Sequence, residues 1–139
     1  MNLFHLIFAD FKIELKDCLV GSKLNEDFCV EFLPSSLKVN WYGARTLCKQ
    51  KFGKEALLLD LQSKEEVKQV DLFKKDLKIW LGNSSTESNL KQIRCPVLNL
   101  EDASTTNQFC LKKFNVACMI PSQKRQIKDI ISKMQDLIL

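Results

Sequence analysis

The stretch Ile79–Cys95, IWLGNSSTESNLKQIRC, joins a short apolar run to a polar loop and a cysteine. Its Trp-Leu-Gly tripeptide at 80–82 predicts a buried strand that ends in a glycine turn. Residues 83–92 are mostly polar, which is typical of an exposed loop. Because only twelve residues separate Gly82 from Cys95, this loop is short.

The composition is that of one globular domain. The chain has 139 residues, of which 45% are hydrophobic and 27% charged, enough for one compact core and too few for two. The net charge of +4 comes from lysines spread over many segments, with no basic run that interleaves aromatic residues, so nucleic-acid binding is not indicated. No stretch approaches eighteen apolar residues, so a membrane span is not predicted either.

Six cysteines are the strongest compositional feature, and an even number suits complete pairing in one of fifteen ways. Buried reduced thiols and a metal site are the alternatives. A zinc site is disfavoured, because C-x2-C spacing is absent and His5 is the single histidine. Disulfides are therefore favoured, and they place the protein on a secretory route. The six are Cys18, Cys29, Cys48, Cys95, Cys110 and Cys118.

The segment 1–17 is predicted to be an N-terminal strand or the remnant of a leader. It begins MNLFHLIFADFK, which is too short for a signal peptide, lacks a basic start and meets Asp10 early. Alternation of Phe4, Leu6 and Phe8 favours a strand. Either targeting is unconventional, or Met1 is not the start of the natural precursor.

Turn and capping residues place the first elements. Residues 18–29 are expected to form a small hairpin, since Asn25 and a Gly-Ser pair favour turns, and a strand follows. Residues 40–53 predict a helix that Asn40 caps and Gly53 ends. The apolar face of this helix carries Trp41, Ala44, Leu47, Cys48 and Phe52.

The middle of the chain alternates strand and helix. A strand is expected within 56–61, followed by a helix over 63–73 that begins with a capping box between Ser63 and Glu66. The late segments 95–100 and 109–120 predict strands, the second of them a hairpin that turns at 112–115.

The segment 121–139 predicts a C-terminal amphipathic helix. Apolar residues recur at helical intervals on one face, and the other face carries charges of both signs. A helix of this length is marginal alone in water, so it is expected to pack on its own domain, on a second copy or on a membrane surface, with protein the favoured support. The apolar residues are Ile127, Ile130, Ile131, Met134, Leu137 and Ile138.

In order and spacing, these residues resemble the C-type lectin-like domain family. Trp41, Ala44 and Cys48 fit the family's W-x-x-A-x-x-x-C pattern, and residues 56–66 resemble its strand–helix junction A-x-L-x-x-I-x-S-x-x-E. The tripeptide at 80–82 is similar to its W-I-G-L motif. Over roughly 18–120 the resemblance implies an α+β C-type lectin-like fold in which two helices flank small antiparallel sheets. It also implies three disulfides, paired Cys18–Cys29, Cys48–Cys118 and Cys95–Cys110.

Carbohydrate-binding members of this family resemble one another in a calcium site, which the chain does not reproduce. Calcium needs several carboxylate oxygens. Where the family has Trp-Asn-Asp, residues 105–107 are Thr-Thr-Asn, and the family's Glu-Pro-Asn is echoed only by Glu87-Ser88-Asn89. The resemblance therefore implies a module that uses no metal and no cofactor.

The chain is expected to be an extracellular module whose partner is a protein ligand or a cell-surface receptor. The expected contact surface consists of residues 83–92 and 101–108. The candidate contact residues are Glu87, Asn89, Glu101, Asp102 and Asn107. A structural domain without a ligand, forming a homodimer through the C-terminal helix, is the alternative, and a carbohydrate-binding lectin is the third.

Other chemistry has little support in the sequence. With one histidine near the terminus and its cysteines paired, the chain offers no catalytic residues, so no enzyme is predicted. Asn83-Ser84-Ser85 is an N-glycosylation sequon in the predicted loop, so Asn83 is a candidate for modification.

Overall fold

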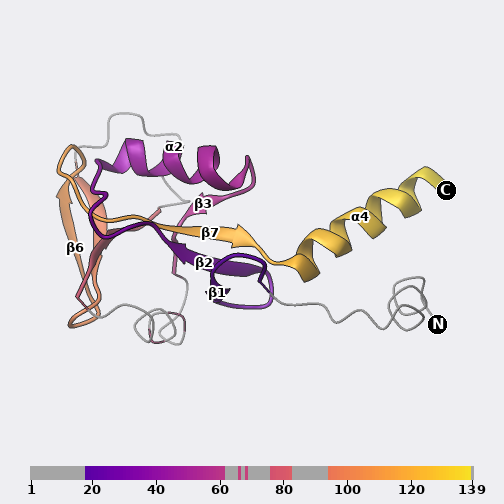
Figure 1. Cartoon of the computed structure of the whole chain (residues 1–139), viewed down its shortest axis with the longest axis horizontal. Helices are drawn as coiled ribbons and strands as arrows, with labels where there is room; N and C mark the ends of the chain where they lie inside the picture. The colour runs from indigo at the N-terminus through magenta and orange to yellow at the C-terminus, as the bar shows by residue number, and fades with distance from the viewer. Residues whose placement is uncertain (1–17, 62–65, 67, 69–75, 83–93, 139) are drawn as a thin grey trace.

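The computed structural model describes residues 18–61, 66, 68, 76–82 and 94–138. They form an α+β fold whose strands are arranged in two antiparallel sheets (Figure 1). In chain order the elements are β1 (Ser22–Lys23), β2 (Phe28–Phe32), α2 (Trp41–Phe52), β3 (Leu57–Leu58), β4 (Lys78–Trp80), β5 (Arg94–Asn99), β6 (Ser104–Phe109), β7 (Ala117–Pro121) and α4 (Gln123–Ile138).

The larger sheet has the strand order β1-β2-β7-β3. Its centre is the antiparallel pair of β2 and β7, in which all five residues of each strand have partners. β1 pairs with β2 through a tight turn, where the side chain of Asn25 accepts hydrogen bonds from the N–H groups of Asp27 and Phe28, each 2.9 Å long. The hairpin predicted over 18–29 is therefore confirmed.

The smaller sheet has the order β4-β5-β6, and β5 and β6 form its hairpin. The predicted hairpin that turns at 112–115 is wrong, because β6 and β7 belong to different sheets. β7 has the sequence ACMIP and is mostly buried, since it pairs with β2 on one side and β3 on the other. β6 is polar and largely exposed, so it lies at the edge of its sheet.

The segment 110–116 crosses from one sheet to the other. Phe114 and Val39 exchange two backbone hydrogen bonds of 3.0 Å, which tie the crossing to the segment before α2. Asn115 is buried, and its side-chain amide donates to the carbonyl of Ser35 at 2.8 Å. A buried amide without such partners would be costly, so Asn115 fixes the path of the crossing.

Helix α2 has the boundaries that its capping residues predict. The side chain of Asn40 accepts a hydrogen bond from the N–H of Gly43 at 2.8 Å. The helix ends at Gly53, whose φ of 98° is a conformation that L side chains rarely adopt. The face toward the sheets is buried at Trp41, Ala44 and Cys48.

The Trp-Leu-Gly tripeptide links the two sheets. Trp80 is fully buried, and its indole N–H donates to the carbonyl of Val39 at 2.8 Å. The indole of Trp41 donates to the carbonyl of Leu81 at 2.9 Å. A Cβ added to Gly82 would lie 3.0 Å from a backbone oxygen of β3, so glycine allows this close approach. The predicted buried strand is therefore confirmed, while the residues that would complete the predicted glycine turn lie outside the described ranges.

Three disulfides hold the fold together, and no free cysteine remains. Cys18–Cys29 closes the first hairpin, Cys95–Cys110 joins the start of β5 to the residue after β6, and Cys48–Cys118 joins α2 to β7. These are the pairs that the family resemblance implies.

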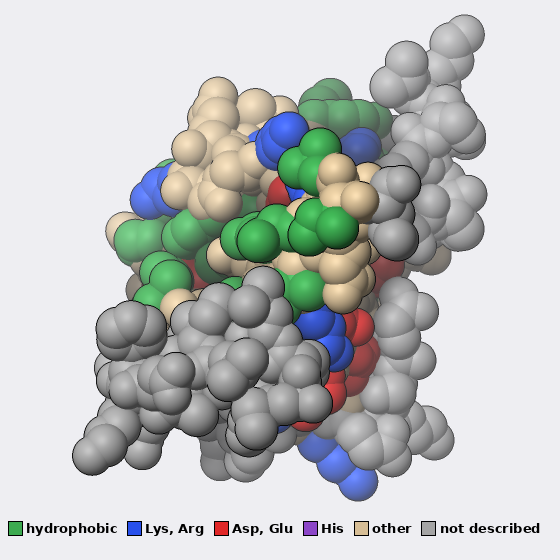
Figure 2. Space-filling view, turned by 90° about the vertical axis from the view of Figure 1, so that its right-hand side faces the viewer, with side chains coloured by type: hydrophobic (Ala, Val, Ile, Leu, Met, Phe, Trp, Pro, Cys, Tyr) green, Lys and Arg blue, Asp and Glu red, His purple; other side chains and the backbone are tan. Residues whose placement is uncertain are grey.

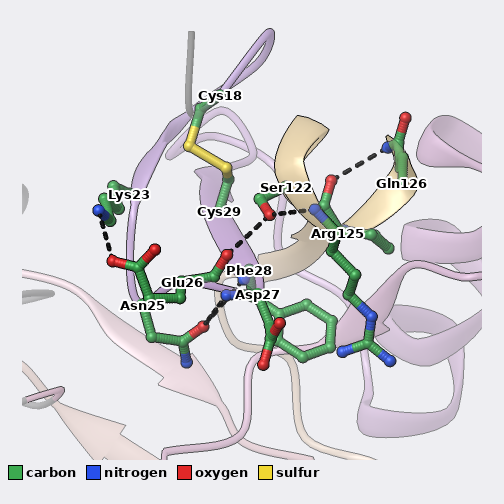
Figure 3. The surroundings of a disulfide bond; sticks show 11 residues. Cys18, Lys23, Asn25, Glu26, Asp27, Phe28, Cys29, Ser122, Arg125 and Gln126 are labelled. Carbon is green, nitrogen blue, oxygen red and sulfur yellow. Dashed lines mark hydrogen bonds and ion pairs between the residues drawn. A yellow bond between two sulfur atoms is a disulfide. The ribbon is translucent and has the colours of Figure 1, made fainter. Parts of the chain in front are cut away.

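Helix α4 projects away from both sheets (Figure 1). Among the described residues, the contacts that anchor it are at its start. The Ser122 hydroxyl donates to the carbonyl of Glu26 and accepts from the N–H of Arg125, whose guanidinium lies 4.7 Å from the ring centre of Phe28 (Figure 3). No residue of α4 is buried. Figure 2, which faces the side from which α4 projects, shows hydrophobic side chains at the surface among polar and charged ones.

Several predictions concern residues outside the described ranges. These are the N-terminal strand or leader remnant at 1–17, most of the helix over 63–73, the sequon at Asn83, and the candidate residues Glu87 and Asn89. Within 63–73 the described residues are Glu66 and Lys68, both helical.

Candidate recognition face

The turn between β5 and β6 carries two of the predicted contact residues, Glu101 and Asp102, both exposed. A carboxylate oxygen of Asp102 accepts hydrogen bonds from the Ser104 hydroxyl at 2.6 Å and from the Ser104 N–H at 3.0 Å. The N–H of Glu101 donates to the side chain of Asn99. Ala103 has a φ of 59°, in the left-handed region, so these side-chain bonds support an unusual backbone.

The same bonds set the ionisation of Asp102. The hydroxyl and N–H of Ser104 hold the pKa of this carboxyl below its ordinary value, and the positive charge of Lys78 acts in the same direction. The turn therefore presents a carboxylate that stays ionised well below neutral pH.

A shallow hollow of about 390 Å³ lies over one face of the smaller sheet. Lys78, Asn99 and Ser104 lie side by side across the three strands, as the strand register requires. Lys112, beyond the end of β6, donates to the side chain of Gln108 at 3.1 Å. The lining residues are Lys78, Val97, Asn99, Ser104, Thr106, Gln108, Lys112 and Phe114.

The chemistry of this hollow is polar and basic. Its polar lining consists of the ammonium groups of Lys78 and Lys112 together with hydroxyl and amide side chains. Val97 and Phe114 supply apolar surface. Among the described residues that line the hollow, none is acidic. The hollow and the turn at 101–103 are together called the recognition face below.

The third described contact residue, Asn107, lies on the other side of β6. Successive side chains of a strand alternate between its faces. Thr106 and Gln108 face the hollow, so Asn107 lies on the opposite face with Phe109, whose ring centre is 4.5 Å from the guanidinium carbon of Arg94. The structure therefore separates Asn107 from the recognition face.

The sequence prediction missed the two lysines of the hollow. Lys78 lies in β4 and Lys112 lies after the penultimate cysteine, so 34 positions of sequence separate them. Only the register of β4, β5 and β6 brings them to one face. The alternation of polar side chains in STTNQF was the one available signal.

A second groove, of about 430 Å³, lies where the end of α2 meets the start of α4. Its charged lining includes Lys49 and Arg125 but also Glu55 and Asp129. Since both signs of charge are present, this groove favours no one class of ligand.

Two further features of the described ranges concern metal ions and membranes. Among these residues, no group of three or more His, Cys, Asp or Glu side chains is placed to hold a metal ion. Glu87 and Asn89 lie outside these ranges, so the calcium-free expectation stays a prediction. Within the same part of the chain, no helix is long and apolar enough to cross a membrane.

No protein-family model and no curated protein sequence matches the chain. Solved structures do match it, and they show that it has the C-type lectin-like fold. Botrocetin superposes with a TM-score of 0.59 at 20% identity, covering 76% of this chain and 99% of its own. The herring type II antifreeze protein gives 0.59 at 18%, covering 75% and 98%.

EMS16, described as an antagonist of the collagen receptor integrin α2β1, gives a TM-score of 0.57 at 19% identity, covering 76% of this chain and 99% of its own. Botrocetin is also known in a complex with the A1 domain of von Willebrand factor. At 19–20% identity these matches show the fold alone, so the non-enzymatic class stays an expectation from the sequence.

Proposed function

We propose that the chain is an extracellular recognition module that binds a protein ligand without calcium, through the recognition face. The observation that carries this proposal is the hollow itself, in which two lysines and several hydroxyl and amide groups converge on one exposed sheet face. Protein surfaces offer carboxylates and backbone carbonyls that such groups bind.

The charges of the face favour a ligand with an acidic centre. Lys78 and Lys112 lie in the hollow, while Glu101 and Asp102 lie on the adjoining turn. A matching surface would therefore present acidic groups opposite the hollow and basic groups opposite the turn. Complementary charges of this kind raise association rates and reject wrong partners more than they raise affinity.

Calcium independence is supported by the side chains that precede Cys110. Thr105, Thr106 and Asn107 carry no carboxylate, and calcium sites need several. Asp102, the nearest carboxylate in the chain, accepts two hydrogen bonds from Ser104 with one of its oxygens.

The structural matches support a protein ligand by analogy. Botrocetin and EMS16 share this fold, and their partners, the A1 domain of von Willebrand factor and integrin α2β1, are proteins. The three disulfides support an extracellular setting, since such bonds persist in oxidising compartments.

The test is a binding screen of the refolded full chain against purified cell-surface proteins and glycans, with and without a calcium chelator. The double variant K78E/K112E is expected to weaken binding at least about tenfold, because it reverses both charges of the hollow. The matched control K51E/K133E makes the same charge change on exposed helix positions and is expected to bind normally. Binding that a chelator abolishes, or that selects glycans alone, would replace this proposal with the lectin alternative.

A second candidate function is self-association through α4. Four of its apolar side chains are well exposed: Ile130 at 57%, Met134 at 43%, Leu137 at 87% and Ile138 at 82%. Ile127 and Ile131 extend the same stripe and are only partly buried. Positions 127, 130, 134 and 137 follow the three- and four-residue spacing of a helix–helix seam, so we propose the α4 stripe of a second copy as the partner.

Sedimentation of the full chain and of an I130K/M134K variant tests the α4 proposal. Both substitutions are on exposed positions of a helix without buried residues, so the domain should fold unchanged. The variant is expected to lose the contact that α4 makes, so its largest species is smaller than that of the unmodified chain. Association that persists unchanged would remove α4 as the interface.

A further inference from the structure

Strand β6 is the open edge of the smaller sheet. It pairs with β5 over all six residues, and no other strand of the described chain pairs with it. The opposite edge of this sheet is covered, because Asn115 exchanges backbone hydrogen bonds with Lys78 and Trp80 of β4, 3.1 and 3.2 Å long. In Figure 1, β6 lies at the left end of the molecule, away from α4.

The outward backbone groups of β6 follow from the register. The N–H of Leu81 donates to the carbonyl of Pro96, so the backbone of Pro96 points toward β4. In an antiparallel ladder the direction alternates at each residue. Pro96 is opposite Asn107, so the backbone groups of Asn107, and likewise of Thr105 and Phe109, point away from β5.

Most of these groups are available for pairing, the exception being the carbonyl of Phe109, which accepts a hydrogen bond of 3.0 Å from the N–H of Lys112. Within the described part of the chain, the N–H groups of Thr105, Asn107 and Phe109 have no hydrogen-bond partner. The carbonyl of Asn107 accepts only a long bond of 3.4 Å from Arg94, whose side chain is exposed. A pairing strand could displace this contact at little cost.

The side chains of β6 do not protect the edge. Soluble proteins usually block an edge with lysine, proline, a bulge or a very short strand. β6 has the sequence STTNQF, which contains no charge and no proline, and it is exposed at Thr105, Thr106, Asn107 and Phe109. The edge strands of the larger sheet, β1 and β3, have only two residues each.

Opposite charges flank the two ends of this strand. Glu101 and Asp102 precede it, and Lys112 and Lys113 follow it. All four side chains are exposed. A second copy running antiparallel places the acidic start of each β6 beside the basic end of the other, so the edge is complementary to itself.

One register between the two β6 strands brings these opposite charges closest together. Outward-pointing residues must face outward-pointing residues. If Asn107 lies opposite Asn107 of the second copy, Thr105 lies opposite Phe109 of that copy. The acidic turn at 101–102 of each copy then lies at the end of the strand pair from which Lys112 and Lys113 of the other copy follow, twice by symmetry.

We propose that β6 pairs edge to edge with β6 of a second copy of this chain, antiparallel, about a two-fold axis at Asn107. The two small sheets then become one sheet of six strands. Because the axis between antiparallel strands is perpendicular to the sheet, both hollows open on the same side. The dimer therefore presents two recognition faces to one partner surface, which raises avidity without a new contact.

Position 107 gives the sharpest test, since only a residue on the axis meets its own copy. N107K and N107D each place like charges opposite one another, and each is expected to weaken dimerisation about two- to fivefold in analytical ultracentrifugation. An equal mixture of the two variants places lysine opposite aspartate and is expected to restore the dimer. Asn107 is exposed, so both variants should fold.

The matched controls S132K and S132D place the same charges on an exposed position of α4 and are expected to dimerise as the unmodified chain does. Three results would overturn the proposal: a chain that stays monomeric up to about 1 mM, where even weak pairing is measurable; N107K and N107D variants that dimerise normally; or a mixture that restores nothing. Loss of the dimer in I130K/M134K but not in N107K would assign self-association to α4. None of these results alters the ligand-binding proposal, which the single variant K78E tests separately, because Lys78 lies in β4 and outside the proposed β6 interface.

Discussion

The disulfide between Cys48 and Cys118 is expected to contribute more stability than either of the others. It joins α2 to β7, which pairs with β2 at the centre of the larger sheet. Both cysteines are fully buried. Its ends are 70 residues apart in sequence, against 15 for Cys95–Cys110 and 11 for the first hairpin. The perturbation is the double variant C48A/C118A.

The magnitude follows from loop closure in the unfolded chain. In the chain-entropy model, a cross-link of this span contributes about 4.4 kcal/mol, against about 3.1 kcal/mol for Cys95–Cys110 and about 2.8 kcal/mol for the first hairpin. Removing two buried sulfur atoms also leaves a small cavity beside Ala44 and Trp41, which adds to the loss. A domain of this size is typically stable by about 5–15 kcal/mol, so the variant keeps only a small margin.

Urea unfolding of the three double-alanine variants measures this order. With an m-value of about 1.5 kcal/mol per molar urea, the loss in C48A/C118A lowers the midpoint by about 3 M. The variants C95A/C110A and C18A/C29A are the matched controls, with shifts of about 2 M each. A C48A/C118A variant no less stable than C18A/C29A would refute the reasoning, because the span of the loop would then not decide the loss.

Three further predictions follow from single side chains. W80F removes the indole donor to Val39 and part of a fully buried ring, so it should lower the free energy of unfolding by about 2 kcal/mol, measured in urea; an unchanged midpoint would contradict the central place of Trp80. The pKa of Asp102 is lowered in the fold by Ser104, so its ionised form adds stability above the unfolded pKa, and this is lost as pH falls through the folded pKa. D102N should therefore destabilise at pH 7 and converge with the unmodified chain in acid; a difference that stays constant with pH would refute the role of the charge. A glycan on Asn83 would slow protein secreted by eukaryotic cells in gel electrophoresis, so N83Q should migrate faster than the unmodified chain. Equal migration of the two proteins would show that Asn83 carries no glycan.

Much of the fold was predictable because local chemistry decides it. Asn40 and Gly53 fix the ends of α2 through a side-chain cap and a positive φ, and both signals are visible in the sequence. The Trp-Leu-Gly tripeptide predicts a buried strand because large apolar residues precede a glycine. The ordered cysteines then select one fold among those with such elements.

The pairing of β6 and β7 was not predictable in the same way. Both segments have strand character and lie close in sequence, which favours a hairpin. In the structure, the crossing at 110–116 is held by Val39 and Ser35, both far away in sequence. Such long-range contacts decide which sheet receives each strand, and no local pattern reports them.

The recognition face could be predicted only in part. Glu101 and Asp102 are visible as acidic residues in a polar segment, and the structure places them on the turn beside the hollow. Lys78 and Lys112 come together only through the register of three strands. Asn107 lies between two residues that line the hollow, Thr106 and Gln108. It points to the other face, because successive side chains of a strand alternate between its faces.

Binding of the refolded full chain to cells tests calcium-independent protein recognition most directly. The measurement compares untreated cells, protease-treated cells and cells in EGTA, each with the unmodified chain and with K78E/K112E. The predicted result is binding that EGTA leaves unchanged, that protease treatment of the cells removes, and that the variant loses at least about tenfold. Binding that EGTA abolishes, or that survives protease and disappears when glycans are removed, would contradict it.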